Sequence, residues 1–172
     1  MKNRDLQATW AYHNGTKHSY QSIRTNPHYL DWENQPLPFK TYSQLEPIPL
    51  PQHLSSSGVP ALLVISAPPQ QPERESVPKV QTLTEILFLS AGITRRKSHP
   101  GGEIVFRAAA CTGALYHIDL YLVCGDLPGL EAGVYHFDPH DFALRRLRKG
   151  DYRAGLGRAS GEEPSIVNAP AV

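Results

Sequence analysis

Prolines are concentrated in the first half of the chain, and their distribution limits what that half can fold into. Eleven of the sixteen prolines lie at or before Pro78, with clusters at residues 36–38 and 47–51. Because proline fixes φ and has no amide donor, these clusters disfavour helices and central strands. We therefore expect much of residues 25–80 to be extended or irregular. Aromatic residues such as Phe39 interrupt the prolines, so the segment is predicted to be an arm laid over another surface rather than a free linker.

Length, charge and cysteine content exclude several classes of protein. A chain of 172 residues can bury one core, and we expect one domain with an extension. The formal net charge of +1 gives no general attraction for nucleic acid or anionic membrane. Two cysteines, Cys111 and Cys124, are too few for a disulfide framework or a paired-cysteine zinc site. No signal-peptide pattern is seen, and the longest apolar run, residues 61–65, is too short to span a membrane, so we expect a reduced, cytoplasmic protein.

The histidines could indicate a metal site and the arginines a nucleic-acid site, but the sequence disfavours both. His13, His18, His136 and His140 lack the spacing and the cysteine or carboxylate partners of a zinc site, so we expect surface or capping histidines and no metal. A basic cluster lies at residues 145–149. A nucleic-acid site would interleave such charge with exposed aromatic residues, whereas leucines alternate with it here. The cluster is therefore predicted to be a solvated edge strand.

The first helix that apolar spacing predicts covers residues 83–91. Its apolar face is expected to contain Leu83, Ile86, Leu87 and Ala91. Residues 82–85 fit a capping box, and Gly92 fits a left-handed C-cap. The basic run at residues 95–97 is then expected to lie at the negative end of this helix. A flexible connection is predicted at residues 101–102.

Alternating apolar residues predict strands in the last third of the chain. One strand is expected at residues 118–124. Residues 133–137 and 142–147 then form a predicted hairpin, closed by the turn-forming residues between them. A short helix is predicted at residues 151–159, and residues 166–172 have the character of an apolar strand.

The stretch at residues 107–121 is the most informative for function. It passes from small residues through Gly113 into the predicted strand. Alanine and glycine leave backbone amides accessible, so a planar ligand can approach without meeting a bulky side chain. From these residues alone, an Ala-rich helix end packed on a sheet is the commoner structure, and both interpretations stay open.

Residues 107–117 resemble a motif of the FMN-dependent nitroreductase superfamily, in particular of its SagB-type azoline dehydrogenase branch. That branch has Arg-x-x-Pro-Ser-Ala-Gly-Ala-Leu-Tyr-Pro before a strand, and Arg107 and residues 113–116 match it. Residues 133–139 resemble the family's Gly-Val-Tyr-His-Tyr segment. The opening of the SagB-type branch is similar to residues 12–18, 31–32 and 38–42. The departures from the motif are Ala110 for Pro, Cys111 for Ser, Thr112 for Ala and His117 for Pro.

The resemblance implies an FMN site in this stretch. Cys111 stands where the family's serine contacts the flavin. The cofactor-binding residues that the resemblance implies are Arg74, Ser76, Arg107, Cys111, Thr112, Gly113 and Ala114. Arg74 and Ser76 belong to a degenerate form of the Arg-Arg-Ser-x-Arg stretch that holds the FMN phosphate, with Pro78 in place of the last arginine. A chance match in a polar loop is an equally good interpretation of residues 74–78.

For the fold, the resemblance implies an α+β protein with the nitroreductase fold, a mixed sheet with packed helices. Residues 1–80 would be the proline-rich arm, and residues 81–172 the first part of the domain. In the family further strands, long dimer-interface helices and a Lys-Tyr element follow. We therefore expect a chain truncated at the C-terminus, in which residues 166–172 begin a central strand.

For function, the resemblance implies a flavin-dependent oxidoreductase that acts on a small molecule or a modified peptide, with NAD(P)H as a candidate reductant. A homo-oligomer, or pairing with a second nitroreductase-like half, would complete the site. No catalytic residue is assigned, and the 172 residues alone are expected to have no turnover. The replacements Ala110, Cys111 and Pro78 keep an alternative open: a non-catalytic, degenerate half that acts as a structural or pairing partner.

Overall fold

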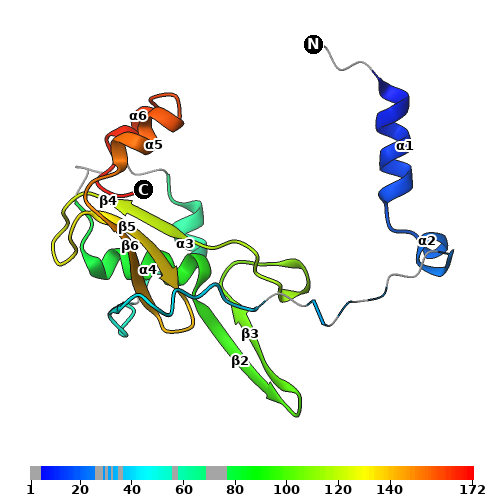
Figure 1. The fold of residues 1–172 in the computed structure, drawn as a ribbon, viewed down its shortest axis with the longest axis horizontal. Helices are drawn as coiled ribbons and strands as arrows, with labels where there is room; N and C mark the ends of the chain where they lie inside the picture. Colours follow the sequence, from blue (N-terminus) through cyan, green and yellow to red (C-terminus); the bar gives the residue numbers. More distant parts are fainter. Residues whose placement is uncertain are drawn as a thin grey trace. The chain divides into compact units, whose positions relative to one another are not determined.

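The computed structural model divides the chain into two compact units, Met1–Pro36 and Leu37–Val172. It describes residues 5–25, 29, 31, 33–34, 37–55, 58–68 and 77–172. The first unit contains helices α1 (Leu6–Thr16) and α2 (Tyr20–Thr25), neither of which has a buried residue (Figure 1). Asp5 caps α1 by accepting a hydrogen bond from the amide of Ala8 at 2.9 Å.

A four-stranded antiparallel sheet organises the second unit. Its order is β1-β6-β5-β4, and the strands are β1 (Pro47–Pro49), β4 (Tyr121–Cys124), β5 (Gly133–Asp138) and β6 (Ala143–Lys149). The hairpin expected at residues 133–147 is confirmed. The strand expected at residues 118–124 begins only at Tyr121, and Ile118 is exposed. Together with the helices below, the sheet confirms the α+β class.

Helix α4 (Val80–Ala91) packs on one face of this sheet (Figure 1). Leu83, Leu87 and Ala91 lie four residues apart, so they share one side of the helix, and all three are buried. They form a single core cluster with buried strand residues, among them Leu122, Cys124, Tyr135, Phe137 and Leu144. Ile86, expected on the same apolar face, is exposed instead.

Helix α4 ends at Ala91 with Gly92 at the C-cap, as expected, but its predicted start and the left-handed conformation predicted for Gly92 are wrong. The helix begins three residues before Leu83, with Lys79 at the N-cap and no side-chain cap, so residues 82–85 lie inside it. Glu85 therefore does not close a capping box, and it accepts hydrogen bonds from the Ser55 amide and from Gln81. Gly92 has extended backbone, φ −65° and ψ 156°, because the chain continues directly into a strand.

That strand, β2 (Ile93–His99), pairs with β3 (Gly102–Arg107) in a separate two-stranded sheet that projects from the body (Figure 1). The basic run at residues 95–97 therefore lies on a strand and does not act on the helix end. Gly101 lies in the tight turn of this hairpin, and Gly102 is the first residue of β3. Arg96 and Glu103 form an ion pair across it at 2.8 Å.

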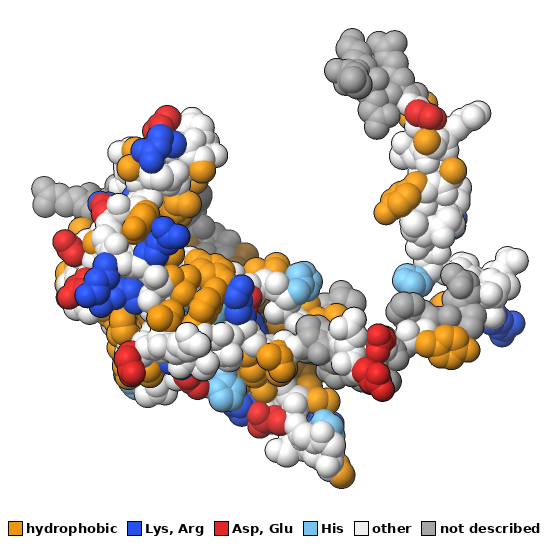
Figure 2. Space-filling model, viewed as in Figure 1, with side chains coloured by type: hydrophobic (Ala, Val, Ile, Leu, Met, Phe, Trp, Pro, Cys, Tyr) orange, Lys and Arg blue, Asp and Glu red, His pale blue; other side chains and the backbone are white. Residues whose placement is uncertain are grey.

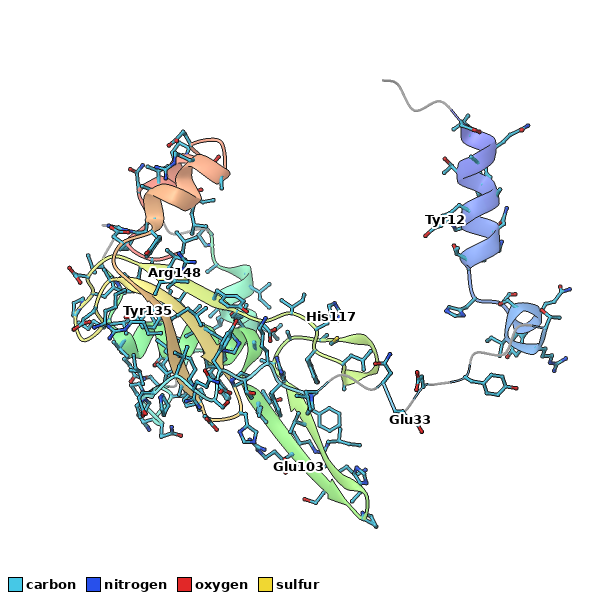
Figure 3. The ribbon with its side chains drawn as sticks, in the orientation of Figure 1. Tyr12, Glu33, Glu103, His117, Tyr135 and Arg148 are labelled. Atoms are coloured by element: carbon cyan, nitrogen blue, oxygen red, sulfur yellow. The ribbon has the colours of Figure 1, made fainter. Side chains whose placement is uncertain are left out.

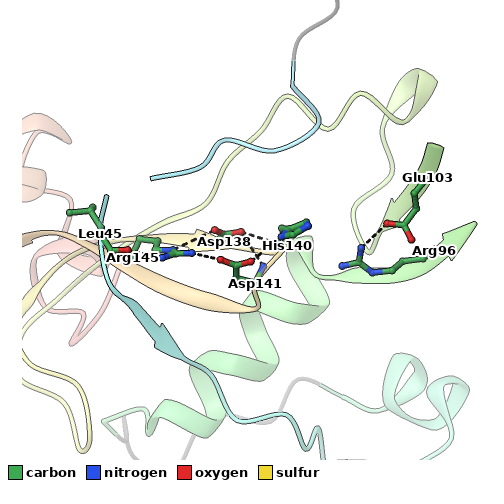
Figure 4. Close-up of polar contacts among 7 residues, drawn as sticks. All are labelled: Leu45, Arg96, Glu103, Asp138, His140, Asp141 and Arg145. Atoms are coloured by element: carbon green, nitrogen blue, oxygen red, sulfur yellow. Dashed lines mark hydrogen bonds and ion pairs between the residues drawn. The ribbon is translucent and has the colours of Figure 1, made fainter. Parts of the chain in front are cut away.

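Residues 38–49 of the proline-rich segment contact the sheet and add a strand to it. β1 pairs with β6, so β6 lies inside the sheet and is not the edge strand that its charges predicted. Arg145 is buried as a result; its Nη1 donates to the carbonyl of Leu45 at 2.6 Å, and its guanidinium pairs with Asp138 and Asp141 (Figure 4). The two prolines of β1 lie at the sheet's edge, where a missing amide donor costs least.

Within residues 58–68, helix α3 (Ala61–Ser66) exposes its apolar side chains, which are Leu62, Leu63, Val64 and Ile65. Hydrophobic side chains also gather on the visible face of the second unit (Figure 2). No helix within the described residues is both long enough and apolar enough to cross a membrane.

The chain ends in two short helices, α5 (Arg153–Ala159) and α6 (Pro164–Val167). The helix expected at residues 151–159 is confirmed in α5. The strand expected at residues 166–172 is largely wrong, because Glu163 caps a helical turn that begins at Pro164. Only the last two residues have strand character: Val172 and Val123 exchange backbone hydrogen bonds of 2.9 and 2.8 Å.

Candidate functional site

The loop between β3 and β4 borders a cleft of about 300 Å³. Residues 108–111 and 115–120 have no regular secondary structure, and one 3-10 turn, Thr112–Ala114, separates them. The expectation of an Ala-rich helix end is therefore wrong. The residues that line the cleft are Ala91, Arg107, Ala109, Ala110, Cys111, Tyr116, His117 and Ile118. This volume lies at the lower end of the range for small-molecule sites.

The loop holds an unusual backbone conformation. Gly113, Ala114 and Tyr116 all have positive φ, of 67°, 54° and 45°. For the two residues with side chains this conformation costs roughly 1–2 kcal/mol each, and such strain is concentrated at functional sites. Among the described residues, a Cβ on Gly113 would contact only Leu115, at 3.7 Å, so the positive φ and not a lack of space favours glycine here.

Arg107 is the charged residue of the cleft. Its side chain comes from the end of β3, and the residue is only 7% exposed. The guanidinium carbon lies 5.1 Å from the centroid of the Phe39 ring and 5.2 Å from that of the Tyr116 ring, and Nη2 donates to the carbonyl of Pro38 at 3.0 Å. Burial lowers the pKa of Arg107. Among the described residues its Nε has no hydrogen-bond acceptor, which is unusual for a buried donor.

Cys111 contributes a thiol to the same cleft. The amide of Tyr116 donates to Sγ at 3.1 Å, and Nδ1 of His117 lies 3.7 Å from it. Figure 3 shows His117 on this loop. Cys111 is half-buried, whereas Cys124 is fully buried in the core, where burial raises the pKa of its thiol. The two cysteines therefore have very different surroundings.

A second polar cluster surrounds His136, which the sequence analysis expected to be a surface or capping histidine; that expectation is wrong. His136 is completely buried, and its ring contacts those of Tyr42 and Tyr121 at 5.1 and 5.3 Å. Among the described residues neither ring nitrogen has a hydrogen-bond partner, and burial lowers the pKa of His136. The two tyrosine hydroxyls lie 3.2 Å apart, and the hydrogen bond of Lys40 with Tyr121 is the main reason that the pKa of Lys40 is raised.

The sequence could have indicated the face of the sheet on which His136 lies, but not the residues that surround it. Alternation along β5 places His136 on the face opposite Tyr135 and Phe137, but nothing in the sequence shows that the proline-rich segment supplies its neighbours.

The residues expected to bind a cofactor are only partly brought together. Arg107 and Cys111 line the cleft, and Gly113 and Ala114 form the adjacent turn. Thr112 lies in the same turn, but its side chain is not described. Arg74 and Ser76, the expected phosphate contacts, lie outside the described residues. In the described part of the chain no group of three His, Cys, Asp or Glu side chains could hold a metal ion.

Fold and site define the class as an α+β domain with a cleft of about 300 Å³ beside a loop of positive-φ residues and a buried arginine. No family model matches the sequence. A protein of Methanocaldococcus jannaschii named "putative nitroreductase" is 27% identical over 93 residues, which cover 54% of this chain and 43% of that protein. The crystal structure of a putative nitroreductase from Anabaena variabilis matches this fold with a TM-score of 0.71 and 27% sequence identity. That match covers 94% of this chain and 30% of the Anabaena chain.

The first match is one of sequence and the second is one of fold, and both relate the chain to nitroreductase-family proteins. The chain spans less than half the length of either relative.

Proposed function

We propose that this chain forms the cofactor-binding part of an FMN-dependent oxidoreductase of the nitroreductase type. The single observation that carries the proposal is the cleft beside Arg107, where a buried guanidinium keeps one donor without an acceptor among the described residues. A buried, unpaired donor is costly, so a ligand that accepts from it gains affinity. The nitroreductase relatives supply the class of chemistry.

The residues of the cleft fit a planar, hydrogen-bonding cofactor. Ala109 and Ala110 line it with single methyl groups, which leaves room for a ring system close to the backbone. The Arg107 guanidinium already packs near the rings of Phe39 and Tyr116, so little conformational freedom is lost when its Nε donates to a ligand. The strained turn at Thr112–Ala114 holds the loop backbone beside the cleft.

When bound, the flavin would supply the electron-transfer chemistry. The chain's own groups would bind and orient it: Arg107 as a fixed donor, Cys111 and the turn residues Thr112, Gly113 and Ala114 as the loop that faces it. Arg74 and Ser76 stay proposed phosphate contacts.

The finer proposals rest on the resemblance to the SagB-type branch. They are a small-molecule or modified-peptide substrate, NAD(P)H as reductant, a cytoplasmic location, and a site completed by a second copy or a second nitroreductase-like half. We also retain residues 1–80 as the arm and residues 81–172 as the first part of the domain. On this proposal the 172 residues alone bind flavin weakly and have no turnover.

The alternative, a non-catalytic half that acts as a pairing partner, is favoured by one observation. Ile86 and Leu89 on α4 and the apolar side chains of α3 are exposed, and apolar surface of this kind is common at interfaces. This alternative predicts association without flavin binding.

Flavin binding is tested by titrating the protein into FMN and following the quenching of flavin fluorescence. Ala110→Leu places a larger side chain in the cleft, and Ala108→Leu makes the same change two residues away, at an exposed position outside the lining. We expect Ala110→Leu to weaken binding at least about tenfold, or about 1.4 kcal/mol, and Ala108→Leu to leave it unchanged. Absence of quenching by wild type, or equal effects of the two variants, would reject the proposal.

A further inference from the structure

We propose that Cys111 is a site of covalent modification by small disulfides that carry an anionic group, with His117 as the base that takes the thiol proton. The geometry of the β3–β4 loop carries this inference, and it does not depend on flavin binding. Cys111 and His117 both line the cleft of about 300 Å³, so a small molecule that enters it meets the sulfur directly.

A hydrogen-bond donor and a candidate base both lie beside Sγ. The Tyr116 amide donates to the sulfur at 3.1 Å, and a fixed donor of this kind stabilises negative charge. Nδ1 of His117, 3.7 Å away, is within reach to accept the proton. A thiolate is the nucleophile in thiol–disulfide exchange, and a neighbouring imidazole is the usual means of forming it.

Arg107 is a second, independent indication of a ligand. It lines the same cleft, and the residue is only 7% exposed. Its buried Nε has no acceptor among the described residues. A guanidinium placed in this way favours a carboxylate or another anion. The sulfur and the positive charge together select a disulfide with an acidic group near its S–S bond.

The reaction is balanced without another oxidant. His117 takes the proton of Cys111, and the resulting thiolate attacks one sulfur of the small disulfide. A new S–S bond forms to Cys111 as the S–S bond of the reagent breaks. The departing sulfur leaves with the bonding electron pair and takes the proton from His117. Cys111 is oxidised, and the departing half of the reagent is reduced to a thiol.

Cys124 provides an internal control, because it is fully buried and reacts only when the structure opens locally. The probe is dithiobis(nitrobenzoate), an anionic aromatic disulfide whose released half ionises in solution to a coloured thiolate that reports each reaction. We expect one equivalent to be released at least about a hundredfold faster than the second. The fast phase should persist in Cys124→Ala and disappear in Cys111→Ser. Two equal rates, or a fast phase that survives Cys111→Ser, would overturn the assignment.

The role of His117 is tested by the pH profile of the fast phase. His117→Gln should slow it about tenfold near neutral pH, and the difference should shrink at alkaline pH, where the thiol ionises without a base. A purely structural role would lower the rate equally at every pH, and this result would remove His117 from the proposal.

The role of Arg107 is tested by comparing the anionic reagent with neutral dithiodipyridine. Arg107→Met should lower the ratio of the two rates about tenfold, the loss expected for one charge-assisted contact. The ratio is insensitive to changes in how open the loop is, because both reagents must reach the same sulfur. An unchanged ratio would reject the preference for anionic disulfides.

Discussion

Two neighbouring arginines on β6 should differ sharply in their effect on stability when each is replaced by methionine. Arg145 faces the proline-rich segment with a side chain 10% exposed, and its partner Asp138 is 1% exposed. Arg146 pairs with Glu131, and those side chains are 27% and 75% exposed. Methionine keeps the apolar stem of either arginine, so each change removes chiefly the charge and its hydrogen bonds.

The magnitudes follow from burial. Arg145→Met leaves the Asp138 carboxylate buried without its cation and the Leu45 carbonyl without its donor. Breaking a buried pair in this way costs roughly 3–5 kcal/mol. Because Asp138 still accepts from the amides of His140 and Asp141, we expect about 3 kcal/mol, at the lower end of that range. Arg146→Met should cost about 0–1 kcal/mol, as exposed pairs do.

The assay is urea denaturation followed by circular dichroism, with the free energy of unfolding taken from the midpoint and slope. The double variant Arg145→Met/Asp138→Asn should recover part of the loss, since it removes the uncompensated charge but keeps an acceptor for the two amides. If Arg145→Met and Arg146→Met lose the same free energy, or if the double variant is less stable than the additive sum, the buried network does not hold the segment as described.

Three further predictions concern stability and pH. Burial lowers the pKa of His136 below its ordinary 6.5, so just below pH 6.5 the unfolded chain binds more protons than the folded chain, and stability should fall as the pH drops through 6.5. In a calorimetric profile of melting temperature against pH, His136→Phe should flatten this part of the curve. An unchanged slope would refute the neutral, buried histidine. Gly133→Ala should destabilise by about 1–3 kcal/mol in urea, because its Cβ would lie 2.8 Å from the carbonyl oxygen of Arg148. Gly155→Ala, in α5 with open space around it, should stabilise by about 0.5–1 kcal/mol in the same assay, and a loss there would show that α5 is not helical in solution.

Short-range sequence patterns predicted the elements that such patterns specify. The hairpin of β5 and β6 follows from alternation and a turn-rich connection, and α4 follows from apolar residues four positions apart. The errors at the ends of α4 have a physical cause. Near the helix start, Gln81 and Glu85 make hydrogen bonds with residues 53–55, which are distant in sequence and which local spacing cannot indicate.

The position of β6 in the sheet and the contacts of the candidate site depend on pairing between residues far apart in the sequence. The charges of β6 indicate an edge strand, yet β1 covers it, and no local pattern marks two prolines as the partners of an arginine-rich strand. In the candidate site, sequence identified the stretch around Arg107 and Gly113. It could not show that Phe39 stacks on Arg107, because that contact joins residues 68 positions apart. The approach of His117 to Cys111 depends on the left-handed turn between them.

The central claim is that FMN binds beside the β3–β4 loop, and hydrogen–deuterium exchange with and without FMN tests its position most directly. The account predicts that saturating FMN slows amide exchange in residues 109–116 at least about tenfold, since the ligand would cover a loop without regular hydrogen bonding. The exposed turn of the β2–β3 hairpin, residues 99–102, should exchange at an unchanged rate. Unchanged exchange in residues 109–116 at saturating FMN, or protection confined to another part of the chain, would contradict the claim.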